Sequence, residues 1–396
     1  MNPSSILIVT FGFEGGLAGS GRLLSDLTRH IDQDRHRVTI FLLTARPVAR
    51  RELAGGVTLI GGDYFSTWFR KVAGVFAIYR LCRNHDFIVS YPELTPTYMT
   101  ILAAMMAFKR PVGGVHVHLS AIFRYRLRPA IHSRIVPLLY PCLRKTIAVS
   151  DGVAEDLRNQ FGLRNVISLP NSIDLDRIET MAGEEMSPDF ETLFEHPVLM
   201  SIGMLGFQKG HDILLHAFAR VRNAGYPHHL IIAGGGEDPE KLRSLARELN
   251  LMDSVHLIGY VNNPYPLLKR AALFVLSSRY EGFALVLAEA MALGIPVVST
   301  DCDAGPREVL ANGRCGVLVP VEDPEALAQG IIRVLDDDKL AQKLREAGLC
   351  EVRKRDVKLW SGKFVDAVVS ASRASAKSGG MECSVEWNAR QTPRND

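Results

Sequence analysis

The sequence predicts an α/β protein with two Rossmann-like, doubly wound parallel-sheet domains that face a central cleft. Short apolar runs alternate with amphipathic segments along most of the 396 residues. Continuous apolar runs are typical of parallel strands buried on both faces, and strands that alternate with helices form parallel sheets. A polar break at about residues 180–195 divides this alternation into two series. Ligands bind at the carboxyl ends of strands in such sheets, so the cleft is the expected site.

The first domain is expected to span residues 1–180. Its strands are predicted at the apolar runs 6–10, 38–43, 57–60, 87–90, 112–117, 147–150 and 166–169. Between them, helically spaced apolar residues such as Leu23, Leu24 and Leu27 indicate amphipathic helices. The apolar segment 97–108 is too short to span a bilayer and is predicted to be a buried helix.

The second domain is expected to span residues 196–350. Its strands are predicted at residues 198–202, 230–233, 255–258, 273–276, 296–300 and 317–319. Pro324 suits the first turn of a helix. Residues 351–370 are predicted to form a terminal helix that packs back on the first domain, and the polar residues 371–396 a disordered tail.

Composition and charge narrow the class of protein. The chain is 47% hydrophobic and 22% charged, which supports a sizeable core and excludes a largely disordered chain. The start of the sequence lacks the basic region of a secretory signal, so a cytoplasmic location is expected. Residues 1–180 hold 22 Lys and Arg against 14 Asp and Glu, whereas the remainder holds 24 against 29. This asymmetry suggests that the two domains have different partners.

Several common site motifs are absent. The 12 histidines form no H-E-x-x-H pattern, so no metal site is predicted. Arg22 stands where a phosphate-binding P-loop needs Lys, and Pro239 stands where a dinucleotide turn after Gly234 needs a third glycine. The basic residues lack an aromatic ladder or zinc pattern, so no nucleic-acid partner is expected.

The most informative stretch is SSRYEGFALVLAEA at residues 277–290. A strand is predicted to end just before it, and a helix to begin near Ala284. The free N–H groups at the start of a helix bind anions, and glycine at 282 lets a ligand approach the backbone. Glu281 and Glu289 would lie about 12 Å apart at helical rise. A carboxylate at each end of a phosphate-binding turn suits a nucleotide sugar. The alternative is that the two glutamates have no binding role, with Glu281 on the surface before the helix and Glu289 within it.

These residues resemble the E-x7-E signature of the retaining GT-B glycosyltransferases of family 4. The resemblance extends over about residues 5–345. SIGMLGFQKGHDILLHAF at 201–218 resembles the family's G-R-L-x-x-x-K-G block, and IAVSDGVAEDL, AGGGEDPEKLRSLA, VHLIGYV, GIPVVSTDCDAGPREVL and CGVLVP follow its order. The resemblance implies the GT-B fold and a nucleotide-sugar donor, with metal not required and no other cofactor.

The resemblance also implies roles for particular residues. Glu281 would bind the donor sugar, Glu289 the ribose hydroxyls and Lys209 the diphosphate. The other implied donor contacts are Gly16, Gly203, Val261, Gly282, Phe283, Ala284, Leu285 and Val286. Gly16 would approach the phosphate or the acceptor, and Val261 would border the base.

One position departs from the family pattern. Met204 replaces the arginine that usually joins Lys209 at the diphosphate. The charge of the leaving group must then be offset by Lys209, by the helix start, or by another cation such as Arg279 or Arg307. An inactive relative that only binds the nucleotide sugar is the alternative.

A histidine of the first domain is expected on the acceptor side. GGVHVHLS at 113–120 places His116 and His118 near the end of a predicted strand. The family has a histidine there that contacts the transferred sugar. His116, which ends the apolar run, is the preferred candidate, and a purely structural role is open for either.

The resemblance implies how the reaction would proceed. Such enzymes retain the anomeric configuration, and the leaving phosphate helps to deprotonate the acceptor in a front-face displacement. The protein mainly orients the reactants and stabilises the charge of the diphosphate. A UDP-sugar 2-epimerase is a competing hypothesis on a similar fold.

The acceptor is expected at a membrane surface. Basic residues interleave with apolar ones at Arg46, Arg50, Arg51, Trp68, Phe69, Arg70, Lys71, Phe123, Arg124, Tyr125, Arg126, Arg128, Arg134, Arg144 and Lys145. Such a surface suits anionic lipid, although a solvated helix face would have the same composition. DCDAGPRE at 301–308 resembles a loop of bacterial enzymes that build surface polysaccharides or lipid-linked oligosaccharides. We therefore expect a peripheral enzyme at the inner membrane face that extends a polysaccharide or a polyprenyl-diphosphate-linked saccharide.

Overall fold

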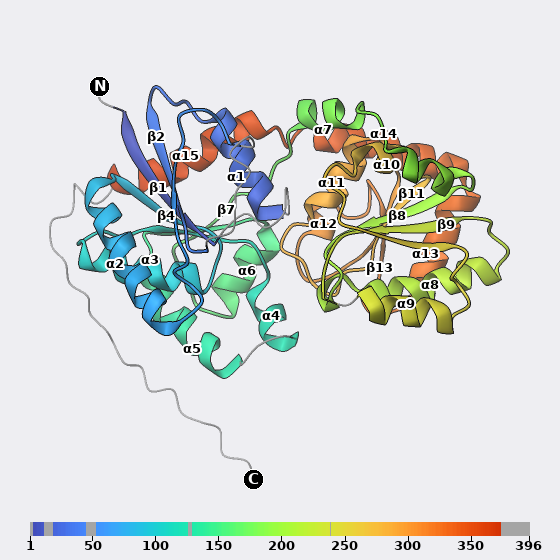
Figure 1. Ribbon diagram of the computed structural model, residues 1–396, viewed down its shortest axis with the longest axis horizontal. Coiled ribbons are helices and arrows are strands. Elements are labelled where there is room, and N and C mark those ends of the chain that lie inside the picture. Colours follow the sequence, from blue (N-terminus) through green and yellow to red (C-terminus); the bar gives the residue numbers. More distant parts are fainter. Residues whose placement is uncertain (1–2, 12–18, 45–52, 126–128, 238, 374–396) are drawn as a thin grey trace, which may run out of the picture.

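A computed structural model shows two α/β domains side by side (Figure 1). It describes residues 3–11, 19–44, 53–125, 129–237 and 239–373. In each domain helices cover both faces of one sheet, and all the strand pairs within each sheet are parallel. The predicted fold class is therefore confirmed.

The N-terminal sheet has seven strands in the order β3-β2-β1-β4-β5-β6-β7. The strand bounds are β1 Ser4–Thr10, β2 His36–Leu42, β3 Thr58–Gly61, β4 Phe87–Ser90, β5 Val112–Val115, β6 Lys145–Ala148 and β7 Val166–Ser168. The central strand β1 is buried from Ile6 onward, as its continuous apolar run predicts. β5 ends at Val115, two residues earlier than expected, so the two candidate histidines lie in the loop that follows.

The C-terminal sheet has six strands in the order β10-β9-β8-β11-β12-β13. The strand bounds are β8 Val198–Ile202, β9 His229–Ala233, β10 Val255–Gly259, β11 Leu273–Leu276, β12 Val297–Thr300 and β13 Val317–Val319. The order reverses between β8 and β11. Ligands bind beside such a switch point, at the carboxyl ends of the strands.

The helices of the N-terminal domain are α1 Gly19–His30, α2 Trp68–Asn84, α3 Thr95–Met106, α4 Leu119–Tyr125, α5 Pro129–Leu139 and α6 Asp151–Asn159. Those of the C-terminal domain are α8 His211–Asn223, α9 Pro239–Glu248, α10 Tyr265–Lys269, α11 Leu285–Ala292, α12 Pro306–Val309, α13 Pro324–Asp336 and α14 Asp338–Val352. The helix predicted at 97–108 corresponds to α3. Among the residues described here, no helix is both long and apolar enough to cross a bilayer.

The segment between the domains has more structure than the polar sequence of residues 180–195 indicates. α7 Leu175–Ala182 and the 3-10 helix Pro188–Phe194 occupy it. Phe194 packs against the core of the C-terminal domain and also against the guanidinium of Arg270, 4.4 Å from its ring centre. The aromatic residues of this polar stretch anchor it to the domain that follows.

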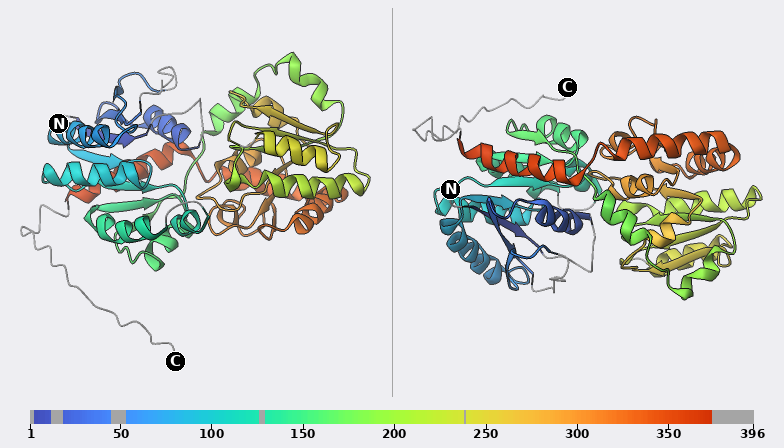
Figure 2. Two further views of the ribbon diagram at one scale, coloured as in Figure 1. Left: turned by 60° about the horizontal axis from the view of Figure 1, so that its bottom comes forward. Right: turned by 90° about the horizontal axis from the view of Figure 1, so that it is seen from above.

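The chain crosses between the domains a second time near its end. α15 Val357–Arg373 lies along the N-terminal domain (Figure 2), against α1 and β4. Trp360, Phe364 and Val368 are buried in the same cluster as Ile6 of β1. Ile173 and Asp356 form a parallel bridge where the two crossings meet. Most of the expected tail, residues 374–396, lies outside the described residues.

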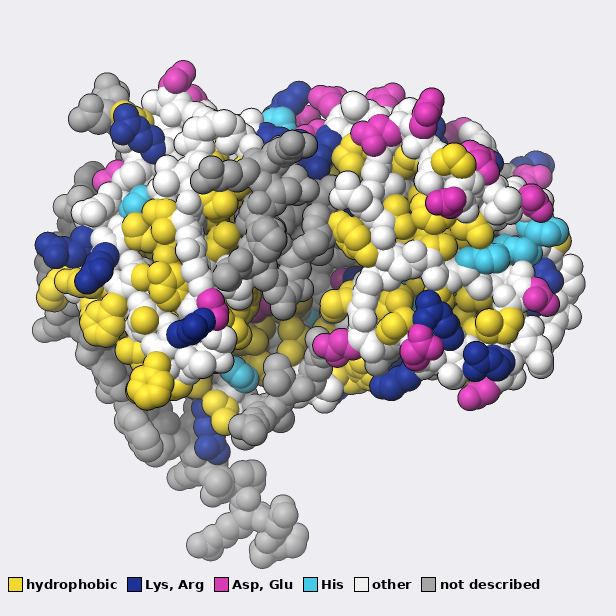
Figure 3. All heavy atoms as spheres, in the orientation of Figure 1, with side chains coloured by type: hydrophobic (Ala, Val, Ile, Leu, Met, Phe, Trp, Pro, Cys, Tyr) yellow, Lys and Arg dark blue, Asp and Glu magenta, His cyan; other side chains and the backbone are white. Residues whose placement is uncertain are grey.

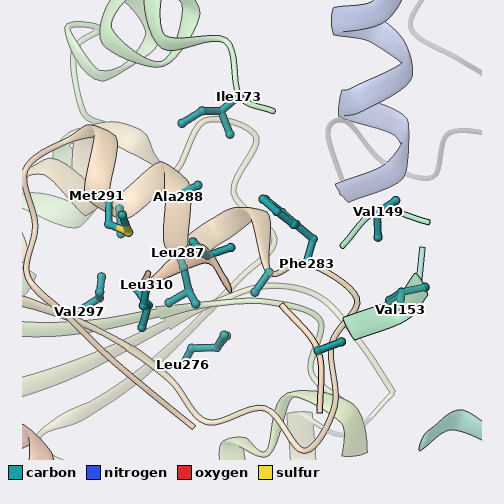
Figure 4. Close-up of a cluster of buried hydrophobic side chains, with 14 of the residues drawn as sticks. Val149, Val153, Ile173, Leu276, Phe283, Leu287, Ala288, Met291, Val297 and Leu310 are labelled. Carbon is teal, nitrogen blue, oxygen red and sulfur yellow. The ribbon is translucent and has the colours of Figure 1, made fainter. Parts of the chain in front are cut away.

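One buried cluster joins the two domains. It contains Val149 and Val153 of the N-terminal domain together with Phe283 and Leu287 of the C-terminal domain (Figure 4). Arg124 of α4 and Asp303 also approach each other across the boundary, with 3.8 Å between Nη1 and Oδ2. The domains therefore contact each other closely, which brings residues of both to one site.

Candidate active site

The turn before α11 presents backbone N–H groups to the space between the domains. Ala284 has φ 64° and ψ 60°, and no side chain caps the first turn of α11. A left-handed conformation is costly for alanine, and such strained residues cluster at ligand sites. The uncapped N–H groups of the first turn leave an anion-binding position open. Phe283 and Ala284 are buried, and Leu285 and Val286 are half-buried.

Glu281 and Lys209 form the charged centre of this turn. Nζ of Lys209 lies 2.5 Å from Oε1 of Glu281, which also accepts a 2.7 Å hydrogen bond from Oγ of Ser278. Gly203 gives the lysine stem room, since a Cβ there would lie 3.1 Å from Cγ of Lys209. The structure thus joins three residues that the sequence assigns to the donor.

Glu289, the second glutamate of the pair, contacts the opposite domain. Its Oε1 accepts a hydrogen bond from Nη1 of Arg22, and the same guanidinium nitrogen donates to the hydroxyl of Tyr265. A pocket lies at this point between the domains, and its lining includes Arg22, Leu285 and Glu289. In the sequence, Arg22 serves only to exclude a P-loop, because no local motif connects it to a residue 267 positions away.

The two arginines that the sequence offers as alternative cations are paired with carboxylates. The guanidinium of Arg279 bonds to Asp212 at 2.9 and 2.6 Å and to Glu322 at 2.8 Å. Arg307 forms an ion pair with Asp301. Met204 is half exposed and carries no charge. Of these three cations, Lys209 is therefore the one that contacts Glu281.

The loop after β5 meets the loop of Glu281. A Cβ on Gly282 would lie 1.8 Å from the carbonyl oxygen of His116, and the amide of His118 lies 3.4 Å from the carbonyl oxygen of Glu281. Glycine at 282 is therefore required by a close approach of the two backbones. This contact brings a histidine of the first domain next to the turn of the second.

The two candidate histidines have different surroundings. Nδ1 of His118 accepts a hydrogen bond from the amide of Ala121 and lies 3.7 Å from Asp156, so this ring supports the start of α4. The ring of His116 stacks edge-on against Tyr91, and its Nε2 has no hydrogen-bond partner among the described residues. Burial lowers the pKa of His116 to about 3, so its ring is neutral at physiological pH.

The remaining predicted residues lie at the edge of the site or outside the described residues. Val261 follows β10 and packs, half-buried, against the shared core. Gly16 lies in the segment 12–18, outside the described residues. Gly234 has a role that the sequence did not indicate: a Cβ there would lie 1.9 Å from the carbonyl oxygen of Gly203, so it permits the loops after β8 and β9 to pack together. Within the described ranges, no three His, Cys, Asp or Glu side chains are grouped as metal ligands are.

The arrangement is that of a GT-B glycosyltransferase, with two parallel α/β domains around a donor-type turn. Residues 17–177 match the family described as Glycosyltransferase Family 4, and residues 185–349 match Glycosyl transferases group 1. The chain belongs to glycosyltransferase family 4, and it is a sugar transferase.

Named relatives agree with this assignment. The chain is 32% identical over 266 residues to the N-acetylgalactosamine-N,N'-diacetylbacillosaminyl-diphospho-undecaprenol 4-alpha-N-acetylgalactosaminyltransferase of Campylobacter jejuni, covering 66% of this chain and 70% of the relative. It is 29% identical to the lipopolysaccharide core biosynthesis glycosyltransferase LpsE of Rhizobium meliloti, covering 50% of this chain and 55% of that protein.

Solved structures show the same fold. Anabaena HepE in complex with UDP-glucose superposes with a TM-score of 0.78 at 19% identity, covering 92% of this chain and 99% of HepE. A glycosyltransferase from Rickettsia africae superposes with a TM-score of 0.74 at 18% identity, covering 94% of this chain and 99% of that protein.

Proposed function

We propose that the chain is a retaining glycosyltransferase that moves a hexose or N-acetylhexosamine from a UDP-sugar to a lipid-linked or polysaccharide acceptor. The observation that supports this most is the geometry around α11, with Glu281 and Lys209 at its start and Glu289 one turn from its end. The N–H groups between them would bind the diphosphate. The carboxylates would hold the hydroxyls of the sugar and of the ribose.

In the proposed reaction, the protein orients the donor and stabilises the charge that develops on the leaving diphosphate. Lys209 exchanges its contact with Glu281 for a phosphate oxygen when the donor binds, which leaves Glu281 available to the sugar hydroxyls. The lysine then stabilises the phosphate charge as the C–O bond to the sugar breaks. The leaving phosphate oxygen takes the proton of the acceptor hydroxyl, which attacks the same face of the sugar. Electrostatic stabilisation and orientation of this kind account for much of enzymatic rate enhancement.

The neutral ring of His116 supports a sugar contact from the first domain. Its buried Nε2 lacks a partner among the described residues, and its backbone touches Gly282 beside Glu281. A buried polar atom without a partner is rare in proteins, and a ligand hydroxyl would satisfy it. We assign this ring to the transferred sugar and the acceptor side of the site.

Two observations support a lipid-linked acceptor: the name of a relative and one face of the N-terminal domain. The Campylobacter jejuni enzyme is named for a diphospho-undecaprenol substrate. Exposed apolar side chains gather on the N-terminal domain (Figure 3), and those on or beside α2, α3 and α5 are Trp68, Phe69, Val72, Phe76, Leu102, Met105, Met106, Phe108, Ile131 and Leu138. We call this set the apolar face.

Charge favours an anionic bilayer as the partner of the apolar face. Residues 94–150 contain no Asp or Glu, and neither does α2. Arg80, Arg83 and Arg134 are exposed on the same helices. Large exposed apolar patches mark interaction surfaces, and basic residues beside them attract anionic lipids. We propose that the enzyme is cytoplasmic and docks through this face as a peripheral protein at the inner side of the membrane.

Part of the basic cluster expected from the sequence faces other partners. Arg124 approaches Asp303 of the C-terminal domain, and Lys145 lies 3.2 Å from Ser370 of α15. Arg46, Arg50, Arg51, Arg126 and Arg128 lie outside the described residues. The proposed membrane face is therefore centred on α2 and α3. Flotation with vesicles tests it: parent protein should bind vesicles containing phosphatidylglycerol, and W68E/F69E should bind several-fold less. Equal binding of both proteins would contradict it.

An activity assay separates the proposed reaction from its competitors. The protein is incubated with UDP-N-acetylglucosamine, UDP-N-acetylgalactosamine or UDP-glucose and a polyprenyl-diphosphate-linked saccharide. Transfer predicts an acceptor heavier by one sugar, one equivalent of UDP and an unchanged anomeric configuration in the product. A changed sugar stereochemistry at C2 without transfer would indicate an epimerase. Nucleotide binding without turnover would favour the degenerate enzyme that Met204 raises as an alternative.

A further inference from the structure

α1 presents one charged stripe to the other domain and to the segment that joins them. Arg22, Asp26 and His30 are spaced four residues apart, so they share one face of the helix. Arg22 bonds to Glu289, Oδ1 of Asp26 accepts a 2.9 Å hydrogen bond from Arg177, and His30 lies 3.1 Å from Asp174. All three pairs cross from α1 to other parts of the fold.

Arg22 and Glu289 form the pair of this stripe that joins α1 to α11, and both line the pocket between the domains. The side chain of Arg22 is 15% exposed and that of Glu289 is 7% exposed. Nε of Arg22 is buried and has no hydrogen-bond partner among the described residues. Breaking a buried ion pair by removing one partner is strongly unfavourable, because it leaves the other charge uncompensated. Arg22 is therefore the charge partner of the buried Glu289 side chain.

The geometry leaves Glu289 able to bind a second group. The hydrogen bonds described for Glu289 engage Oε1 alone, with Arg22 as the donor. An ionised carboxylate has about four acceptor positions on its two oxygens. An arginine that holds one oxygen fixes the direction of the other, and a fixed acceptor loses less entropy when it binds hydroxyls.

We propose that Arg22 is a positioning residue for the nucleoside half of the donor. It holds Glu289 oriented toward the ribose, and it links the ribose position to the contact between the two domains. The inference rests on the proposed function, since it assigns Glu289 to the ribose. Arg22 acts through Glu289 and does not contact the diphosphate.

Comparing uridine with UDP tests this assignment. Calorimetric titration measures the affinity of both ligands for the parent protein and for R22M. Loss of Glu289 orientation should weaken uridine and UDP by the same factor, at least about tenfold. A residue that contacts the diphosphate would weaken UDP and leave uridine unchanged, which would overturn the proposal. So would parental affinity of R22M for both ligands.

A mutant cycle establishes the route of the effect. R22M should lower the affinity for uridine in the parent background. It should not lower this affinity further in the E289Q background, because Arg22 acts through Glu289. Equal effects in both backgrounds would contradict this route. A matched control, R124M, removes an arginine that also crosses between the domains but lies outside the pocket. It should leave uridine affinity within about twofold of the parent.

Further readouts exclude a merely structural effect. In the transfer assay, R22M should raise the KM for the donor sugar with a smaller change in kcat. Thermal unfolding confirms that R22M is folded. If R22M does not fold, R22K and R22Q replace it. R22K keeps the charge without the planar guanidinium and should give an intermediate loss of uridine affinity. Parental uridine affinity in both R22K and R22Q would refute the role of Arg22. A parent protein that binds neither uridine nor UDP would instead count against the proposed function.

Discussion

Nζ of Lys209 and Oε1 of Glu281 lie 2.5 Å apart, so the two opposite charges beside the turn before α11 form an ion pair. Glu281 is 5% exposed and also accepts from Ser278. A negatively charged diphosphate competes with Glu281 for the lysine and thereby frees the carboxylate for the sugar. In the proposed function, the diphosphate of the donor replaces Glu281 as the partner of Lys209. Substitution of Lys209 and substitution of Glu281 should therefore have different effects on binding and transfer.

Glu281→Gln should abolish most transfer and preserve the fold. The amide keeps the size of the side chain but removes the charge, so transfer should fall by at least about 100-fold, as when one stabilising group is removed from an active site. Product formation is measured by mass spectrometry of the acceptor. E351Q, at a glutamate of α14 that pairs with Lys354, is the matched control and should keep full activity. Parental activity in E281Q would refute the site assignment.

Lys209→Met should discriminate between ligands with and without phosphate. A hydrogen bond to a charged group contributes about 1.5–3 kcal/mol, so UDP affinity should fall by at least about tenfold. Uridine affinity should change little, because Lys209 is assigned to the diphosphate. Calorimetry with both ligands measures this pattern. It differs from that expected for R22M, which should lose affinity for uridine and UDP equally. An equal loss for uridine and UDP would place Lys209 away from the phosphates.

Met204→Arg should strengthen nucleotide binding. Met204 is 50% exposed, and the nearby Arg279 and Arg307 are committed to carboxylates. A second cation at the diphosphate should therefore raise UDP affinity about three- to tenfold. Met252, which is 49% exposed and follows α9, provides the control M252R. Unchanged UDP affinity in M204R would mean that another cation already occupies the diphosphate site.

Gly282→Ala should disturb the contact between the domains. The added Cβ would lie 1.8 Å from the carbonyl oxygen of His116, a distance at which the backbone has to move. Small-angle scattering should show a larger radius of gyration, and transfer should fall sharply. G206A is the matched control, because a Cβ at Gly206 meets no atom within 4 Å. A compact, fully active G282A would show that the two loops separate during normal turnover.

Acidification should destabilise the fold through two histidines, His116 and His211, whose pKa values lie below the ordinary range. Burial lowers the pKa of His116 to about 3 and that of His211 to about 4, whereas both titrate near 6.5 when unfolded. Between these values the unfolded chain binds more protons, so stability falls as the pH drops below about 6.5. Each histidine should cost about 2 kcal/mol between pH 7 and pH 5. Urea unfolding of the parent, H116Q and H211Q measures the slope, which should be shallower in each variant. Equal slopes in all three would contradict neutral burial.

The sequence predicted the strands well because parallel strands are buried on both faces. Apolar runs such as 198–202 and 273–276 coincide with β8 and β11. Their continuous hydrophobicity is a local signal, and the same is true of the polar turn that carries Glu281. The length of β5 was overestimated, because the apolar Val117 follows the strand without pairing.

The contacts that sequence reasoning missed join distant segments. Arg22 meets Glu289 through the packing of two domains, and Arg279 is held by Asp212 and Glu322 from separate elements. No periodicity or short motif encodes such pairs. The roles of glycines 234 and 282 likewise depend on which backbones approach each other in three dimensions.

Binding of nucleotides to the purified protein tests whether Lys209 and Glu281 form a donor site. Thermal unfolding is followed with UDP, GDP, ADP and their common sugars, because a ligand that binds only the folded state raises its stability by mass action. UDP and UDP-sugars should raise the unfolding temperature of the parent protein, and K209M should diminish this shift. Either of two results would contradict a donor site at Lys209 and Glu281. One is that none of these ligands shifts the unfolding temperature of the parent protein, and the other is that the shifts of the parent and of K209M are equal.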